Sequence, residues 1–120
     1  MKVNGCSFQR FVITVWILSI GTVSYLSLIP QTEFLCYFRW SDKLYHFLAY
    51  VWLSALPFFG FAGTKKAIKW SLLMILLGVG LEFAQSFVPG RFFSIWDMIA
   101  NSLGASTGIL CVMRLRAGKD

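Results

Sequence analysis

Residues 70–88 read WSLLMILLGVGLEFAQSFV, an apolar run that is long enough to cross a membrane and carries a single carboxylate, Glu82. A hydrocarbon core about 30 Å thick requires about 20 apolar residues of helix, so this run predicts a transmembrane helix. At a rise of about 1.5 Å per residue, Glu82 lies roughly 9 Å below the end of the span at Val88. An ionisable group at such a depth is costly to insert and marks a functional site by default.

Three further apolar runs raise the number of predicted membrane-spanning helices to four. Pro57 is expected to kink the second of them, because proline lacks an N–H and clashes with the preceding helical turn. Four spans use most of the 120-residue chain and leave short loops, so residues 1–120 are predicted to form a single domain. The predicted fold is an all-α, integral membrane four-helix bundle. Its spans are about residues 11–29, 44–61, 70–88 and 95–113.

The composition fits a membrane protein. Hydrophobic residues make up 58% of the chain and charged residues 13%, whereas soluble domains carry about 25% charged residues. The net charge of +6 comes from small basic groups at the ends of apolar runs, and not from a basic stripe or arm, so no nucleic acid is expected as a partner. The basic residues are unequally divided between the two sides of the spans, which predicts that both termini are cytoplasmic. One side has Lys2, Arg10, Lys65, Lys66, Lys69, Arg114, Arg116 and Lys119, and the other has Arg39, Lys43 and Arg91.

Polar residues of three predicted spans gather at the end that faces away from the termini. Asp42, His46 and Tyr50 recur every four residues and therefore share one face of the second helix. A charge that faces lipid at the bilayer centre costs about 2.5–3.5 kcal/mol, and facing inward toward a partner removes much of this cost. We therefore expect one shared polar pocket in the outer half of the bilayer. Its candidate binding residues are Asp42, Lys43, His46, Glu82, Gln85, Arg91, Asp97 and Asn101.

Several of these residues also have a structural interpretation. Glu82 can serve as packing glue through a hydrogen bond to Asn101 or Gln85, an interaction that contributes about 0.6 kcal/mol on average. Asp97 fits the first turn of the fourth helix, where a negative charge is favourable. His46 can be a simple interfacial histidine.

The remaining signals are weaker. Arg91 can be merely solvated, although its guanidinium suits a carboxylate or a phosphate. The Gly104 and Gly108 pair predicts close helix packing within the protein in preference to a dimer face. A metal site needs at least three convergent ligands, and no spacing signature supports one, so neither a metal nor another cofactor is predicted.

The polar pattern resembles that of the VanZ-like family of small integral membrane proteins. The family signature resembles D-K-x-x-H-x-x-x-Y, followed by E-x-x-Q, P-G-R and S-x-x-D-x-x-x-N-x-x-G. The resemblance implies a multi-pass protein of the bacterial inner (cytoplasmic) membrane whose pocket contains the same eight residues. The family is named after a member associated with resistance to the glycopeptide teicoplanin, which implies a role in cell-envelope biology or in antibiotic response. The matching residues are Ser27, Pro30, Asp42, Lys43, His46, Tyr50, Glu82, Gln85, Pro89, Gly90, Arg91, Ser94, Asp97, Asn101, Gly104 and Gly108.

Three functions are compatible with this pattern. The first is a binding or accessory role, in which the pocket recognises an anionic headgroup, such as that of a lipid-linked envelope precursor in the bilayer. The second is a membrane enzyme that acts on the same class of substrate with His46 and Glu82 as an acid–base pair. The third is a small proton-coupled exporter, although transporters bind substrate at the midplane and Glu82 lies nearer the outer end.

Overall fold

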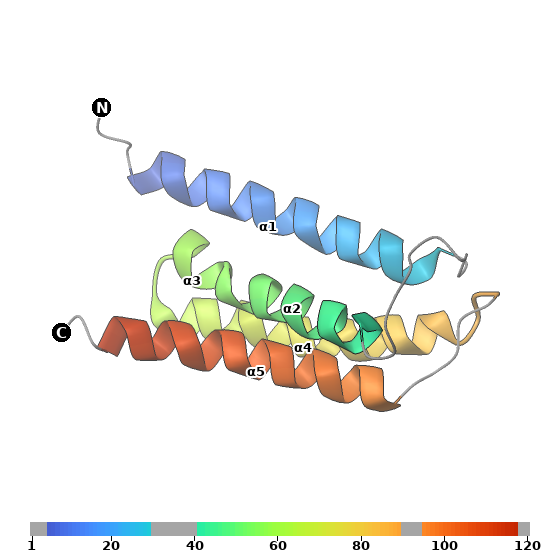
Figure 1. Ribbon diagram of the computed structural model, residues 1–120. Helices are drawn as coiled ribbons and strands as arrows, with labels where there is room; N and C mark the ends of the chain where they lie inside the picture. The colour runs from blue at the N-terminus through green and yellow to red at the C-terminus, as the bar shows by residue number, and fades with distance from the viewer. Residues whose placement is uncertain (1–4, 30–40, 90–94, 118–120) are drawn as a thin grey trace.

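The protein is a bundle of helices that run nearly alongside one another (Figure 1). The computed structural model describes residues 5–29, 41–89 and 95–117, and within these ranges it contains helices and turns but no strand. The predicted all-α architecture is therefore confirmed for the described part of the chain. The helices are α1 (Gly5–Leu28), α2 (Ser41–Ala55), α3 (Pro57–Gly60), α4 (Thr64–Gln85) and α5 (Ile95–Ala117).

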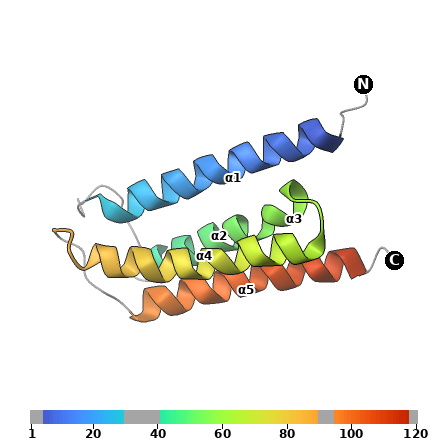
Figure 2. The same cartoon turned by 180° about the vertical axis from the view of Figure 1, so that it is seen from behind.

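Three of the helices, α1, α4 and α5, have the length and hydropathy of membrane spans. With 22 residues, α4 is roughly 33 Å long at about 1.5 Å per residue, which matches a hydrocarbon core about 30 Å thick. With 15 residues, α2 is shorter than a span, and it approaches that length only together with α3 beyond Pro57. The described part of the chain thus has three unbroken helices that are long and apolar enough to cross a membrane, and one broken helical segment beside them. The start of α1 and the end of α5 lie at the same end of the bundle (Figure 2).

The helices overlap the predicted spans but extend farther toward the chain termini. α1 begins at Gly5, six residues before the predicted span, and α5 ends at Ala117, four residues after it. α4 begins at Thr64, so Lys65, Lys66 and Lys69 belong to a helix and not to a loop. Lysine and arginine can stay in a helix at a membrane boundary because their aliphatic stems cover apolar surface while the charge reaches water. A predicted span that is ended at the flanking charged residues is therefore shorter than the helix that contains it.

Pro57 breaks the helix between α2 and α3, which confirms the predicted kink. Proline has no N–H to offer to the carbonyl of Leu53, four residues earlier. That carbonyl instead accepts a hydrogen bond from the indole Nε1 of Trp16 at 2.9 Å, and the next carbonyl, of Ser54, accepts one from Ser71 Oγ at 2.6 Å. A broken helix is tolerated in lipid where neighbouring helices satisfy the freed backbone groups. Here α1 and α4 each supply one such donor.

The same level of the bundle holds an aromatic cluster. Phe61 and Trp70 stack with their ring centroids 5.5 Å apart, and Trp16 meets both rings edge-on, at 5.6 and 5.7 Å. Offset stacks and edge-on pairs are the favourable geometries for aromatic rings. The cluster fixes the connection between α3 and α4 against α1.

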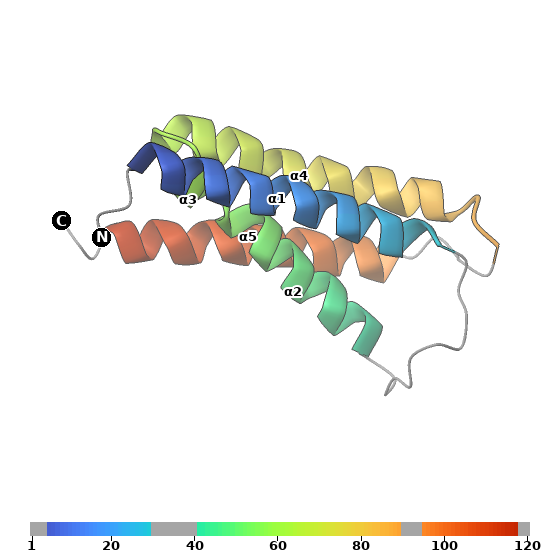
Figure 3. The ribbon, with the colours of Figure 1, turned by 90° about the horizontal axis from the view of Figure 1, so that it is seen from above.

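The tightest packing in the bundle joins α2 to α5, which α2 crosses obliquely (Figure 3). A Cβ atom added to Gly104 would overlap the carbonyl oxygen of Phe47, and one added to Gly108 would lie 2.6 Å from the carbonyl oxygen of Val51. Small residues allow two helix backbones to approach this closely. The prediction that Gly104 and Gly108 serve packing inside the protein is therefore confirmed.

Candidate functional site

Four of the predicted site residues meet where α2 begins and α5 begins. Lys43 Nζ lies 3.3 Å from Asp97 Oδ1, and His46 Nε2 lies 3.9 Å from Asp97 Oδ2. His46 Nδ1 also lies 2.9 Å from Asn101 Oδ1. Asp97 therefore stands between two basic groups, and His46 stands between Asp97 and Asn101. We call Lys43, His46, Asp97 and Asn101 the polar cluster.

The helical periods of α2 and α5 create this cluster. Lys43 and His46 are three residues apart on α2, and Asp97 and Asn101 are four apart on α5, so each pair occupies one helix face. The close approach of the backbones at Gly104, one turn beyond Asn101, brings the two faces together. The packing glycine is thus also what places the polar groups within reach of one another.

The hydrogen bond between His46 and Asn101 fixes the proton on the imidazole ring. A carboxamide oxygen can only accept, so Nδ1 of His46 must donate. In the neutral ring Nε2 then carries a lone pair, and it faces the carboxylate of Asp97. The hydrogen bond to Asn101 therefore leaves Nε2 as the ring nitrogen that can accept a hydrogen bond.

α4 covers the polar cluster from the side. Gly78 lies against it: an added Cβ would come within 3.1 Å of Asn101 Cβ and 3.2 Å of Tyr50 Cε1. Glu82, one turn later on α4, is 1% exposed and acts electrostatically on Tyr50. The structure therefore places Glu82 in the wall beside the cluster, deep among side chains of the bundle.

Gln85 links α4 to α1. Its Nε2 donates to the carbonyl oxygen of Ser27 at 2.9 Å, and the side chain is buried. Ser27 lies in the last turn of α1, where helix carbonyls lack an intrahelical partner, so Gln85 satisfies one of them. The described contact of Gln85 is thus structural and lies at the same end of the bundle as the polar cluster.

Two predicted site residues remain without a structural description. Arg91 and the side chain of Asp42 lie outside the described residues, as do Gly90 and Ser94 of the family-like pattern. Within the described ranges, no group of three or more His, Cys, Asp or Glu side chains is placed to hold a metal ion. The roles of Trp16 and Ser71 were not predicted, although Pro57 implied that a nearby helix must supply a donor.

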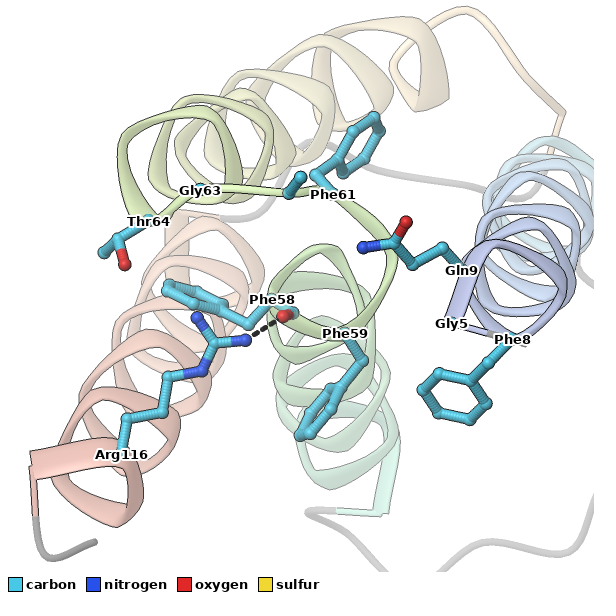
Figure 4. Close-up of a pocket in the computed structure, with 10 residues that line it drawn as sticks. Gly5, Phe8, Gln9, Phe58, Phe59, Phe61, Gly63, Thr64 and Arg116 are labelled. Atoms are coloured by element: carbon cyan, nitrogen blue, oxygen red, sulfur yellow. Dashed lines mark hydrogen bonds between the residues drawn. The ribbon is translucent and has the colours of Figure 1, made fainter. Parts of the chain in front are cut away.

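The structure also contains a cavity of about 420 Å³ that sequence reasoning did not predict. It lies between the starts of α1 and α4, α3 and the end of α5 (Figure 4). The polar cluster is at the other end of the bundle, where α2 and α5 begin. Arg116 and several phenylalanine side chains line it.

These features define a class: a small helical membrane protein with ionisable groups buried at one end of its bundle. Comparison with known proteins identifies the family within that class. Residues 6–116 match the VanZ/LLP1 family, and the chain belongs to it. The resemblance found in the polar pattern is therefore confirmed.

A curated relative comes from the fission yeast Schizosaccharomyces pombe and is described as an uncharacterised protein. It is 27% identical to this chain over 107 residues, which cover 87% of this chain and 64% of the relative. The chain thus spans less than two thirds of the length of that protein. No solved structure gives a significant match.

Proposed function

We propose that the chain binds the anionic headgroup of a membrane lipid at the polar cluster. The observation that carries this proposal is the gradient of exposure across the cluster. The side chain of Lys43 is 31% exposed, whereas those of His46 and Asp97 are 13% and 10% exposed. The cluster therefore opens at its cation, and an incoming headgroup meets Lys43 first.

The geometry of Lys43 supports binding of a phosphate. An ammonium group has three N–H donors, and the contact with Asp97 occupies one of them. Asp97 holds Lys43 in place, so little side-chain freedom remains to be lost when an anion binds. Arg91, a predicted residue of the same pocket that lies outside the described residues, would add a second cation.

The source of the headgroup determines the biological role. A lipid-linked envelope precursor carries a phosphate or pyrophosphate next to a long isoprenoid chain, so its headgroup lies at the depth of the cluster. Binding of such a lipid would give the chain an accessory role in the cell envelope and in the response to glycopeptide-type antibiotics. Location in a bacterial inner membrane and cytoplasmic termini are part of this proposal.

A second function, acid–base catalysis on the same lipids, is favoured by one observation. Asn101 fixes the His46 ring so that Nε2 faces Asp97, which is the arrangement of a histidine base oriented by an amide and stabilised by a carboxylate. The pair of this mechanism is His46 with Asp97, whereas the sequence pattern paired His46 with Glu82. The proton-coupled exporter stays a prediction without a further observation behind it.

The test compares binding of farnesyl phosphate and of farnesol to the purified protein in neutral detergent. We expect saturable binding of the phosphate, weakened about tenfold in Lys43→Gln, since a charge-assisted contact is lost. Lys69→Gln, at the opposite end of the bundle, is the matched control and should bind as the wild type does. Equal affinity for farnesyl phosphate and farnesol, or equal affinity in the two variants, would disprove the headgroup site.

Catalysis is tested separately by incubating the protein with a polyprenyl diphosphate and measuring released phosphate. Turnover that is lost in both His46→Ala and Asp97→Asn, with binding retained, would establish the enzyme. Binding without phosphate release in the wild type would contradict the enzyme and support the accessory role.

A further inference from the structure

The cavity at the opposite end of the bundle has the chemistry of a second, independent site. Its wall combines Arg116 and the polar side chains of Gln9 and Thr64 with four phenylalanine side chains (Figure 4). Its volume of about 420 Å³ falls within the range of about 300–1,000 Å³ that is typical of small-molecule pockets. A cavity with a cation and an aromatic wall suits a ligand that is anionic at one end and apolar at the other.

Arg116 is held in a fixed position in this wall. Its guanidinium lies 5.4 Å from the centroid of the Phe58 ring, and one N–H group donates to the carbonyl oxygen of Phe58. Arginine has five N–H donors in a planar arrangement, so most of them remain for a ligand. A prepositioned guanidinium of this kind matches the oxygens of a phosphate group.

The charge around the cavity favours an anion. The described segments at this end, 5–16, 56–70 and 109–117, contain six Lys or Arg residues and no Asp or Glu. Lys66 is one of them, and its Nζ lies 6.0 Å from the ring centroid of Phe61, which lines the cavity. Glu82 and Asp97, the carboxylates whose side chains the structure describes, are both near the other end of the bundle. Among the described residues, an anion that enters the cavity therefore meets basic groups and no carboxylate.

The exposure of two wall residues indicates that the ligand comes from the bilayer. Phe8 of α1 is 47% exposed and Phe59 of α3 is 46% exposed, and both line the cavity. Part of each ring therefore faces the surroundings of the bundle, at the boundary where lipid headgroups would meet the apolar length of α1. An acyl chain can lie against these rings while its headgroup reaches Arg116.

We propose that this cavity binds the phosphate of an anionic glycerophospholipid at Arg116, with an acyl chain packed against Phe8 and Phe59. The bound lipid would bridge α1 to α3 and α5 at this end. The site shares no residue with the polar cluster, so its test is independent of the function proposed there.

The first test uses nanodiscs of phosphatidylglycerol or phosphatidylcholine and counts, by native mass spectrometry, the lipids that stay on the released protein. We expect one phosphatidylglycerol to be retained by the wild type and retention to fall about tenfold in Arg116→Gln, since a charge-assisted contact is removed. Arg114→Gln is the matched control, because it removes the same charge from the same helix end but lies outside the cavity wall. Equal losses in the two variants, or equal retention of both lipids, would overturn the proposal.

A second variant tests the cavity without altering charge or the bond to Phe58. Gly5 lines the cavity, and an added Cβ there meets nothing within 4 Å, so Gly5→Phe can be accommodated and should obstruct lipid entry. Gly21→Phe, in an equally open position farther along α1, is its control. Retention that is lost only in Gly5→Phe supports the site, and retention unchanged in Gly5→Phe contradicts it.

A third measurement, in which inorganic phosphate is added, identifies the source of the anion. Inorganic phosphate at millimolar concentration should not displace the lipid, because it lacks the acyl chain that contacts Phe8 and Phe59. Complete displacement by inorganic phosphate would show that the cavity is a site for a free anion and would overturn the lipid proposal.

Discussion

Trp16 on α1 donates its indole N–H to the carbonyl oxygen of Leu53. Pro57, four residues after Leu53, has no N–H with which to satisfy this carbonyl inside the helix. The donor Trp16 and the acceptor Leu53 lie on different helices, 37 residues apart in the sequence. The proline therefore does more than bend α2: it exposes an acceptor that a neighbouring helix uses for docking. Trp52 adds a second bond at this level, from its Nε1 to Ser19 Oγ at 3.0 Å.

Loss of the indole hydrogen bond should destabilise the bundle only while Pro57 is present. We expect Trp16→Phe to lower the free energy of unfolding by the packing cost of the smaller ring plus about 1 kcal/mol, the usual net value of such a bond. In the Pro57→Ala background the Leu53 carbonyl can regain an intrahelical donor, so the same substitution should lower the free energy of unfolding by the packing cost alone. Reversible unfolding in sodium dodecyl sulfate measures all four proteins. Equal costs in both backgrounds would show that Trp16 contributes only its ring.

Addition of a methyl group at Gly104 or Gly108 should separate α2 from α5. The added Cβ would meet backbone carbonyl oxygens of α2, which cannot move aside as a flexible side chain can. We expect Gly104→Ala and Gly108→Ala each to cost about 1–3 kcal/mol, the usual cost of overpacking, measured in the same unfolding experiment.

Gly80 on α4 is the control for that prediction, since a Cβ there meets nothing within 4 Å. Gly80→Ala should be neutral or stabilise the protein by up to about 1 kcal/mol, because alanine is the better helix former. A loss of stability at Gly80 as large as at Gly104 would show that glycine is required for a reason other than helix packing.

The proton position on His46 can be observed directly, because the chain contains one histidine. Nitrogen-15 NMR of labelled protein should show the neutral ring protonated at Nδ1, which is the less common tautomer in free imidazole side chains. Asn101→Leu removes the acceptor and should shift the ring toward the Nε2-protonated form. Ser102→Ala, at the adjacent position of α5, should leave the spectrum unchanged. An Nε2-protonated ring in the wild type would contradict the hydrogen bond to Asn101.

Gln85 should hold the last turn of α1. In Gln85→Leu the carbonyl of Ser27 loses its described donor, and we expect amide hydrogen exchange at the end of α1 to accelerate about fivefold, which corresponds to about 1 kcal/mol. Ser86→Ala is the control, because its hydroxyl bonds within α4, to the carbonyl of Phe83. Unchanged exchange in Gln85→Leu would mean that other contacts secure this turn.

Much of the architecture follows from apolar length and from residues whose backbone chemistry is unusual. The runs around α1, α4 and α5 are long enough to predict membrane helices, Pro57 predicts the break, and the spacing of Gly104 and Gly108 predicts a close approach. The helix ends were less predictable, because the charges of Lys65, Lys66 and Lys69 lie on the helix itself. Charge marks where a membrane ends, and the hydrogen-bonded helix continues beyond that point.

The candidate site was predictable as a group of residues but not as a set of contacts. Helical spacing brings Lys43, His46, Asp97 and Asn101 to one end of the bundle, yet it does not determine which atoms meet. The partner of His46 depends on how far α2 approaches α5, and this distance is set by Gly104. The cavity at Arg116 escaped prediction for a related reason: its wall is assembled from four helices and the connection between α3 and α4, and no local spacing in the sequence indicates such a wall.

The unequal packing of the helices has a consequence for how the sequence can vary over time. On α1, side chains such as Phe11, Leu18 and Tyr25 are about two thirds exposed and contact few other residues, so any apolar residue should be accepted there. On α5, by contrast, the positions of Gly104 and Gly108 leave no room for a side chain. A saturation library scored for folded protein in the membrane should therefore accept substitutions at more positions of α1 than of α5, although both helices are similarly long and apolar.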